Sequence, residues 1–153
     1  MASIASRVSD NIGLVIDELD KYEKDLEKIA EVSDFEGKKL EQLCKDHPKN
    51  LWFFKSRAND LKNLEEFLDI EYAKIESELW RHYNEKVQIK LSTSDIKMYI
   101  NSDNEIISYK KIMSEVKNIR CRFDAAVEAV EAMGWQISYI VKLRVAMMEE
   151  ALL

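Results

Sequence analysis

Basic and aromatic residues alternate in one stretch near the middle of the chain. The residues in this stretch that could bind a ligand are Trp80, Arg81, His82, Lys86, Lys90, Lys97 and Tyr99. From residue 81 to residue 97, four basic residues stand against two acidic ones, in a chain of net charge −6. Cationic groups interleaved with aromatic rings are typical of proteins that bind single-stranded nucleic acid. We therefore expect these cations to contact phosphates, and Trp80 or Tyr99 to stack on bases.

Residues suited to catalysis or metal binding are scarce by comparison. The two histidines, His47 and His82, lie far apart, and no glycine-rich phosphate loop, GxSxG or HExxH motif occurs. Glu78 and His82 are one helical turn apart, but a di-iron bundle needs Glu-x-x-His on two helices. The two cysteines have no disulfide or zinc spacing and suit a reducing compartment. We expect no enzyme activity, no cofactor and no metal.

Composition favours long helices. The 153 residues are the length of one domain, 34% are charged, and there are only 3 glycines and 1 proline. No apolar run approaches the roughly 18–20 residues that cross a bilayer, and the N-terminus lacks the apolar block of a signal peptide. We therefore expect a soluble intracellular protein.

The first half of the chain shows helical periodicity. Apolar residues from Ile4 to Ile29 step by three and four, which predicts one helix over about residues 3–32 that must pack against a partner. A capping box at Ser33 and Glu36 predicts a second, short helix with Leu40, Leu43 and Cys44 on its inner face, ending before Pro48. A third helix is expected from about residue 50 to residue 84, with an 11-residue apolar repeat.

The periodicity changes after Tyr83. Apolar and polar residues alternate on both sides of the turn-favouring segment 92–95, which predicts a β-hairpin over about residues 85–101. This register places Lys90 opposite Lys97, a repulsive pair that makes sense if an anion binds between them. The alternative is an exposed hairpin whose lysines protect an edge strand from aggregation.

The last third predicts one long helix. Ser102 and Glu105 form a second capping box, and an apolar stripe continues from Ile112 to Met147 with Gly134 inside it. Gly134 suggests a bend or a close helix crossing. The basic residues Lys110, Lys111, Lys117, Arg120 and Arg122 suit either phosphate contacts or the solvated back of this helix. The chain thus divides into a helical region (1–84), a hairpin (85–101) and an oligomerisation helix (102–153), within one structural domain.

Part of this last helix also carries a family resemblance. The residues concerned are Phe123-Asp124-Ala125-Ala126, Ala129, Gly134-Trp135-Gln136-Ile137, Ile140 and Leu143-Arg144, and upstream Tyr83, Leu91-Ser92 and the segment 95–100 fall at fitting distances. In these positions the chain resembles UvsY-type phage recombination mediator proteins, over about residues 40–146.

The resemblance implies an accessory protein of phage recombination without enzymatic activity, working in the cytoplasm of an infected bacterium. Such a protein binds single-stranded DNA and helps a RecA-like phage recombinase load onto it against a phage single-stranded DNA-binding protein. It also implies a homo-oligomeric ring of six or seven subunits driven by the C-terminal region. Here the expected oligomerisation residues are Phe123, Val130, Gly134, Trp135, Ile137, Ile140 and Arg144.

The sequence differs from the family at two positions that contribute to DNA binding there. A lysine and an arginine that contribute to DNA binding in the family correspond here to Ser77 and Leu79. The DNA-binding charge is therefore expected at Lys74, at Arg81 or at the hairpin lysines.

Together these observations predict a mainly α fold, with an elongated long-helix protomer and one β-hairpin, assembled as a ring. The expected function is recombination mediation on single-stranded DNA. The alternative is a structural coiled-coil oligomerisation scaffold without nucleic acid binding, and a helical-bundle enzyme is a third possibility.

Overall fold

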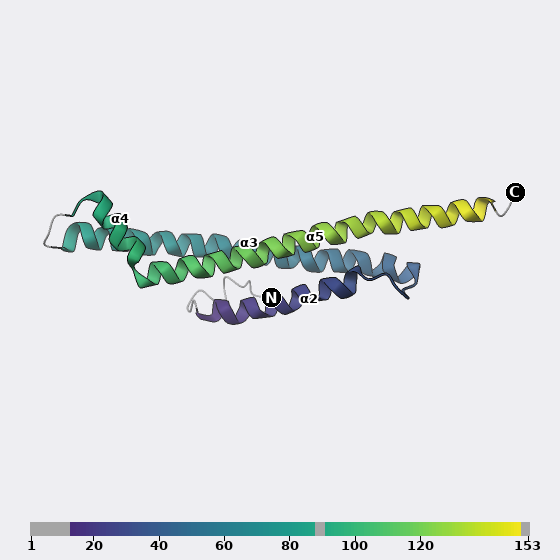
Figure 1. The fold of residues 1–153 in the computed structure, drawn as a ribbon, viewed down its shortest axis with the longest axis horizontal. Coiled ribbons are helices and arrows are strands. Elements are labelled where there is room, and N and C mark those ends of the chain that lie inside the picture. The colour runs from purple at the N-terminus through teal and green to yellow at the C-terminus, as the bar shows by residue number, and fades with distance from the viewer. Residues whose placement is uncertain (1–12, 88–90, 151–153) are drawn as a thin grey trace. The chain divides into compact units, whose positions relative to one another are not determined.

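A computed structural model describes residues 13–87 and 91–150. Its elements are the helices α2 (Gly13–Ser33), α3 (Leu40–Arg81), α4 (Thr93–Ser102) and α5 (Asn104–Glu150), and a π-helical turn, η1 (His82–Lys86) (Figure 1). Helices α3 and α5 have 42 and 47 residues. The described residues contain no strand. A mainly α fold built on long helices is therefore confirmed.

Helix α3 is continuous where the sequence predicted a break. Pro48 lies inside it, so the expected short helix ending before Pro48 is wrong. Because proline has no backbone N–H, the carbonyl of Cys44 lacks its usual helical hydrogen bond to residue 48. Pro48 and Cys44 are both exposed, so water can satisfy that carbonyl. The expected placement of Cys44 on the inner face is also wrong.

The link between α2 and α3 is a turn and contains no capping box. The backbone N–H of Glu36 donates to the Asp34 carboxylate at 2.9 Å, and Gly37 has a φ of 71°, which glycine adopts without strain. The helix starts only at Leu40. The expected capping box of Ser33 and Glu36 is therefore wrong.

Packing divides the chain into two compact units. The described part of unit 1 is 13–19, 60–87 and 91–118, and that of unit 2 is 20–59 and 119–150. Helices α3 and α5 contribute to both units, so the units do not follow the boundaries expected at residues 84 and 101.

The core of unit 2 centres on Phe123 of α5, which is fully buried. Its ring meets Tyr22 of α2 edge-on at 5.9 Å and Phe54 of α3 at 6.2 Å between centroids. Three ion pairs between helices surround these rings: Arg122–Glu23, Lys55–Glu131 and Arg57–Asp25. Within unit 2 the stripe of α2 thus finds its packing partner in its own chain.

The core of unit 1 contains the residues that were expected to form the hairpin. Ile96 and Ile100 of α4 are buried with Ile106 of α5. Packed against these three are Tyr72, Ile75, Leu79, Trp80, Tyr83 and Leu91. The second strand of the predicted hairpin is therefore wrong, because residues 93–102 are helical.

A capping box explains why this segment is helical. The Ser92 hydroxyl accepts from the Asp95 backbone N–H at 3.2 Å, and the Asp95 carboxylate accepts from the Ser92 N–H at 3.2 Å. Ile96 and Ile100 are also four residues apart, so a helix places them on one face as well as a strand would. Of the expected first strand, residues 85 and 86 belong to η1 and 88–90 lie outside the described residues.

The N-cap of helix α5 lies one residue later than expected, at Asp103, and the helix begins at Asn104. Asp103 accepts from the backbone N–H groups of Glu105 and Ile106 at 2.8 and 3.4 Å. Ser102 instead donates its hydroxyl to the Tyr99 carbonyl at 2.9 Å. The capping box of Ser102 and Glu105 is therefore wrong, and Asp103 stabilises this N-terminus.

Gly134 allows α3 and α5 to approach closely within unit 2. A Cβ atom at Gly134 would lie 2.7 Å from Nε2 of His47. The same Nε2 hydrogen-bonds to the Val130 carbonyl oxygen at 2.9 Å, and it must carry the proton to donate there. Gly134 thus leaves room for an imidazole that bridges the two helices, which agrees with the expected close crossing.

This contact predicts a coupling between Gly134 and His47. In the wild-type background, Gly134→Ala should displace the imidazole of His47 and break its hydrogen bond, which lowers the free energy of unfolding by about 1 kcal/mol. This loss should offset the roughly 1 kcal/mol by which alanine stabilises a helix relative to glycine. In the His47→Ala background no hydrogen bond is lost, so Gly134→Ala should raise the free energy of unfolding by the full roughly 1 kcal/mol. Urea unfolding of the four variants measures both effects, and equal effects in the two backgrounds would contradict the contact.

Candidate nucleic-acid interface

A hollow of about 380 Å³ opens between α3 and α4 in unit 1. It is lined by Ala73, Glu76, Ser77 and Trp80 of α3 and by Lys97, Ile100 and Asn101 of α4. On each helix these residues recur every three or four positions, so they form one face. The structure therefore brings together Trp80 and Lys97, two residues singled out from the sequence.

The lining of this hollow suits a flat ring with a charged substituent. Trp80 offers a half-buried indole, and Lys97 is an exposed cation on the opposite helix. Ser77 and Asn101 supply hydrogen-bonding groups, and the Asn101 Oδ1 already accepts from Lys110 at 2.8 Å. Glu76 offsets the charge of Lys97, so further cations must come from neighbouring residues.

A short row of aromatic rings lies in the same unit. Tyr83 and Tyr99 are stacked, with centroids 5.5 Å apart and planes 21° apart. His82 meets Tyr83 edge-on at 5.4 Å. Tyr99 is 44% exposed, but one face of its ring is covered by Tyr83.

The π-helical turn η1 presents the remaining cations. Arg81, His82 and Lys86 are all exposed at or beside it. Neither Arg81 nor Lys86 forms an ion pair with another residue that the structure describes. Single π-helical turns occur frequently at functional sites. These two charges are therefore available to a bound anion.

Other cations from the sequence analysis are placed less favourably. Lys74 pairs with Glu71 on its own helix. Arg120 pairs with Asp124, and Arg122 with Glu23. The ammonium of Lys110 lies 5.9 Å from the ring of Tyr72. The basic cluster of α5 is thus largely engaged within the chain, and Lys90 lies outside the described residues.

The expected oligomerisation residues fall into two groups. Phe123, Val130 and Ile137 are buried in unit 2, so their assignment to an assembly surface is wrong. Gly134 faces His47. Trp135 is 72% exposed, Ile140 is half-buried and Arg144 is exposed.

Sequence reasoning named Trp135 and Met147 but missed the second apolar stripe of α5 to which they belong. Trp135, Tyr139, Leu143 and Met147 recur every four residues, and each is at least 60% exposed. The stripe through Ile137 is the longer pattern in the sequence because it continues from Ile112, whereas the second stripe begins only at Trp135. The spacing of four was the signal that could have identified it.

The described residues contain neither a membrane-spanning helix nor a cluster of metal-binding side chains. No helix among them is long and apolar enough to cross a membrane. Within the same ranges, no three histidine, cysteine or acidic side chains gather where they could hold a metal ion. No protein-family model, curated protein or solved structure matches the chain.

The α3–α4 hollow predicts a specific role for Lys97 in binding single-stranded DNA. Because Lys97 is exposed, Lys97→Ala should leave the fold intact while removing one phosphate contact. The log–log salt slope for poly-dT should then become shallower by about 0.7. Lys62→Ala is the matched control, since Lys62 is an exposed lysine of α3 outside the hollow. Equal slopes for both variants would exclude Lys97 as a contact.

Proposed function

We propose that this protein is a single-stranded DNA-binding recombination mediator. It would load a RecA-like phage recombinase onto DNA covered by a phage single-stranded DNA-binding protein, in the cytoplasm of an infected bacterium. The resemblance in the segment 123–144 supports this family of functions. The α3–α4 hollow supports the DNA-binding step.

One observation carries the DNA-binding proposal. Trp80 and Lys97 come from two different helices and line the same hollow, and Arg81 and Lys86 remain unpaired among the described residues. A chain of net charge −6 repels a polyanion unless its cations are concentrated where the strand lies. A base on Trp80 and phosphates on these cations would combine stacking with charge neutralisation.

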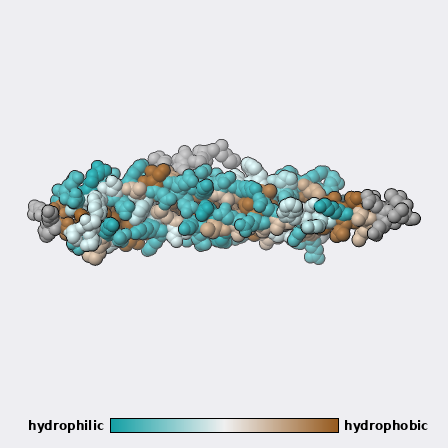
Figure 2. Space-filling model, turned by 90° about the horizontal axis from the view of Figure 1, so that it is seen from above, coloured by the Kyte–Doolittle hydropathy of each residue, from teal (hydrophilic) through white to brown (hydrophobic). Residues whose placement is uncertain are grey.

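The end of α5 supports the proposed assembly into a ring of six or seven subunits. Among the side chains that the structure describes, none after Ile137 is buried. Yet Tyr139, Leu143 and Met147 lie on one side of α5, and Val141 and Val145 on another. Figure 2 shows hydrophobic residues gathered at this end of the helix. A helix that is apolar nearly all round is normally buried, so other subunits would cover it.

The same exposed helix also favours the second candidate function, a structural oligomerisation scaffold. A scaffold needs the assembly surface of α5, whereas the α3–α4 hollow and the free cations would have no ligand. DNA binding therefore separates the two functions.

Fluorescence anisotropy with a labelled poly-dT oligonucleotide at low and high salt makes this distinction. The proposed mediator should bind at low salt and lose affinity steeply as salt rises, because phosphate contacts release counterions. No binding at low salt would favour the scaffold. A mediator should further speed assembly of the recombinase on DNA that carries its single-stranded DNA-binding protein.

The assembly surface predicts a charge-sensitive oligomer. Tyr139→Asp with Leu143→Asp should lower the mass measured by light scattering, because each carboxylate would have to be buried between subunits. Both side chains are at least 60% exposed in the protomer, so helicity should persist. Ser138→Asp is the control, an exposed polar position on the same turn. An unchanged mass for the double variant would exclude this stripe.

A further inference from the structure

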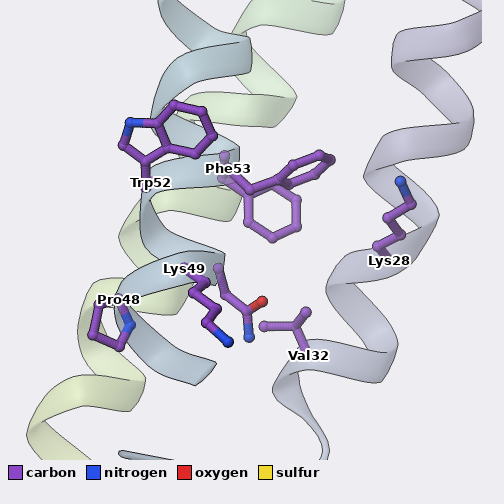
Figure 3. Close-up of a pocket in the computed structure, with 8 residues that line it drawn as sticks. Lys28, Val32, Pro48, Lys49, Trp52 and Phe53 are labelled. Atoms are coloured by element: carbon purple, nitrogen blue, oxygen red, sulfur yellow. The ribbon is translucent and has the colours of Figure 1, made fainter. Parts of the chain in front are cut away.

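A second and larger hollow, of about 710 Å³, lies between α2 and α3 in unit 2 (Figure 3). It is lined by Lys28 and Val32 of α2 and by Pro48, Lys49, Asn50, Trp52, Phe53 and Phe54 of α3. Figure 3 shows Phe53 between the two helices, with Lys28 and Val32 on the far side. The lining is thus mostly apolar and aromatic.

Charge at this hollow is positive in a chain that is acidic overall. The lining includes two lysines and no carboxylate. Asp25 of α2 pairs with both Lys28, at 2.5 Å, and Arg57, at 2.9 Å, so one anion is shared by two cations. The Lys49 ammonium lies 3.9 Å from Asp46, and its side chain is 78% exposed. An anion can therefore approach both lysines.

The aromatic residues of the hollow differ in what already covers them. The Lys28 ammonium lies 4.8 Å from the centroid of Phe53, and the Arg57 guanidinium 5.5 Å from it. Phe54 packs against Phe123 in the core. Trp52 is 72% exposed, which is unusual for so large an apolar side chain. Its indole is the ring available for stacking.

We infer that the α2–α3 hollow is a second contact for single-stranded DNA, with a base stacked on Trp52 and phosphates on Lys28 and Lys49. This inference rests on the proposed function. Asn50 adds an amide that can hydrogen-bond a base edge. The α3–α4 hollow repeats the same set of residue types, with tryptophan, lysine and asparagine in its lining.

The composition of the lining favours a nucleic acid strand over a protein helix. An apolar helix face laid across this hollow would take the ammonium groups of Lys28 and Lys49 out of water together with their partners Asp25 and Asp46. Removing ion pairs from water is costly, because the lost hydration can exceed the attraction between the charges. A phosphodiester strand supplies an anion for each ammonium and a flat ring for the indole.

Photocrosslinking tests this inference directly. The full-length protein is bound to oligo-dT that carries 5-iododeoxyuridine and irradiated, and the crosslinked peptides are identified by mass spectrometry. Crosslinks at Trp52 or Phe53 are the expected result.

The outcomes separate this inference from the proposed function. Crosslinks confined to Trp80 and Tyr99 would overturn the second contact and leave DNA binding in place. Absence of both binding and crosslinks would overturn the second contact together with the proposed function.

Variants give an independent measure. Trp52→Ala should weaken poly-dT binding at least about fivefold at any salt concentration. Lys49→Ala should make the log–log salt slope shallower by about 0.7, whereas Lys45→Ala, one turn earlier on α3 and paired with Glu41, should not. Unchanged DNA affinity in Trp52→Ala, with loss of recombinase binding, would assign the hollow to a protein and overturn the inference.

Discussion

The burial of Phe123 between α2 and α3 is the contact on which unit 2 depends. Its ring contacts Tyr22 and Phe54, so one side chain of α5 holds the other two helices. A buried ring of this size stabilises a fold by about 1.5–3 kcal/mol. With Phe54 fixed in the core, the two preceding residues of α3, Trp52 and Phe53, line the α2–α3 hollow. The same packing that makes the core therefore creates the proposed second DNA contact.

Helix α5 has two different tasks along its length. From Val116 to Ile137 one stripe of its apolar residues is buried by the chain itself. Beyond that point apolar residues continue, but no described side chain of unit 2 buries them. The proposed assembly would thus use a surface that a single protomer leaves exposed, so a change of oligomeric state would not disturb the Phe123 contact. In a ring, weak contacts to DNA would repeat once per subunit and add along one strand.

Periodicity predicted the long helices, because apolar residues that recur every three or four positions over a long segment share one face only if the segment is helical. It failed where one spacing fits two structures: Ile96 and Ile100 share a face in a strand and in a helix, and only the mutual bonds of Ser92 and Asp95 favour the helix. Pro48 was misjudged because its exposure could not be known. Trp80 and Lys97 were identified by residue type, but their shared hollow depends on tertiary packing.

The central claim is that this chain assembles with copies of itself and carries single-stranded DNA on that assembly. Native mass spectrometry of the wild-type protein with oligo-dT tests both parts at once. The account predicts a species whose mass is a multiple of 17.9 kDa plus one bound oligonucleotide. A 17.9 kDa protomer, free of DNA at low salt, would contradict it.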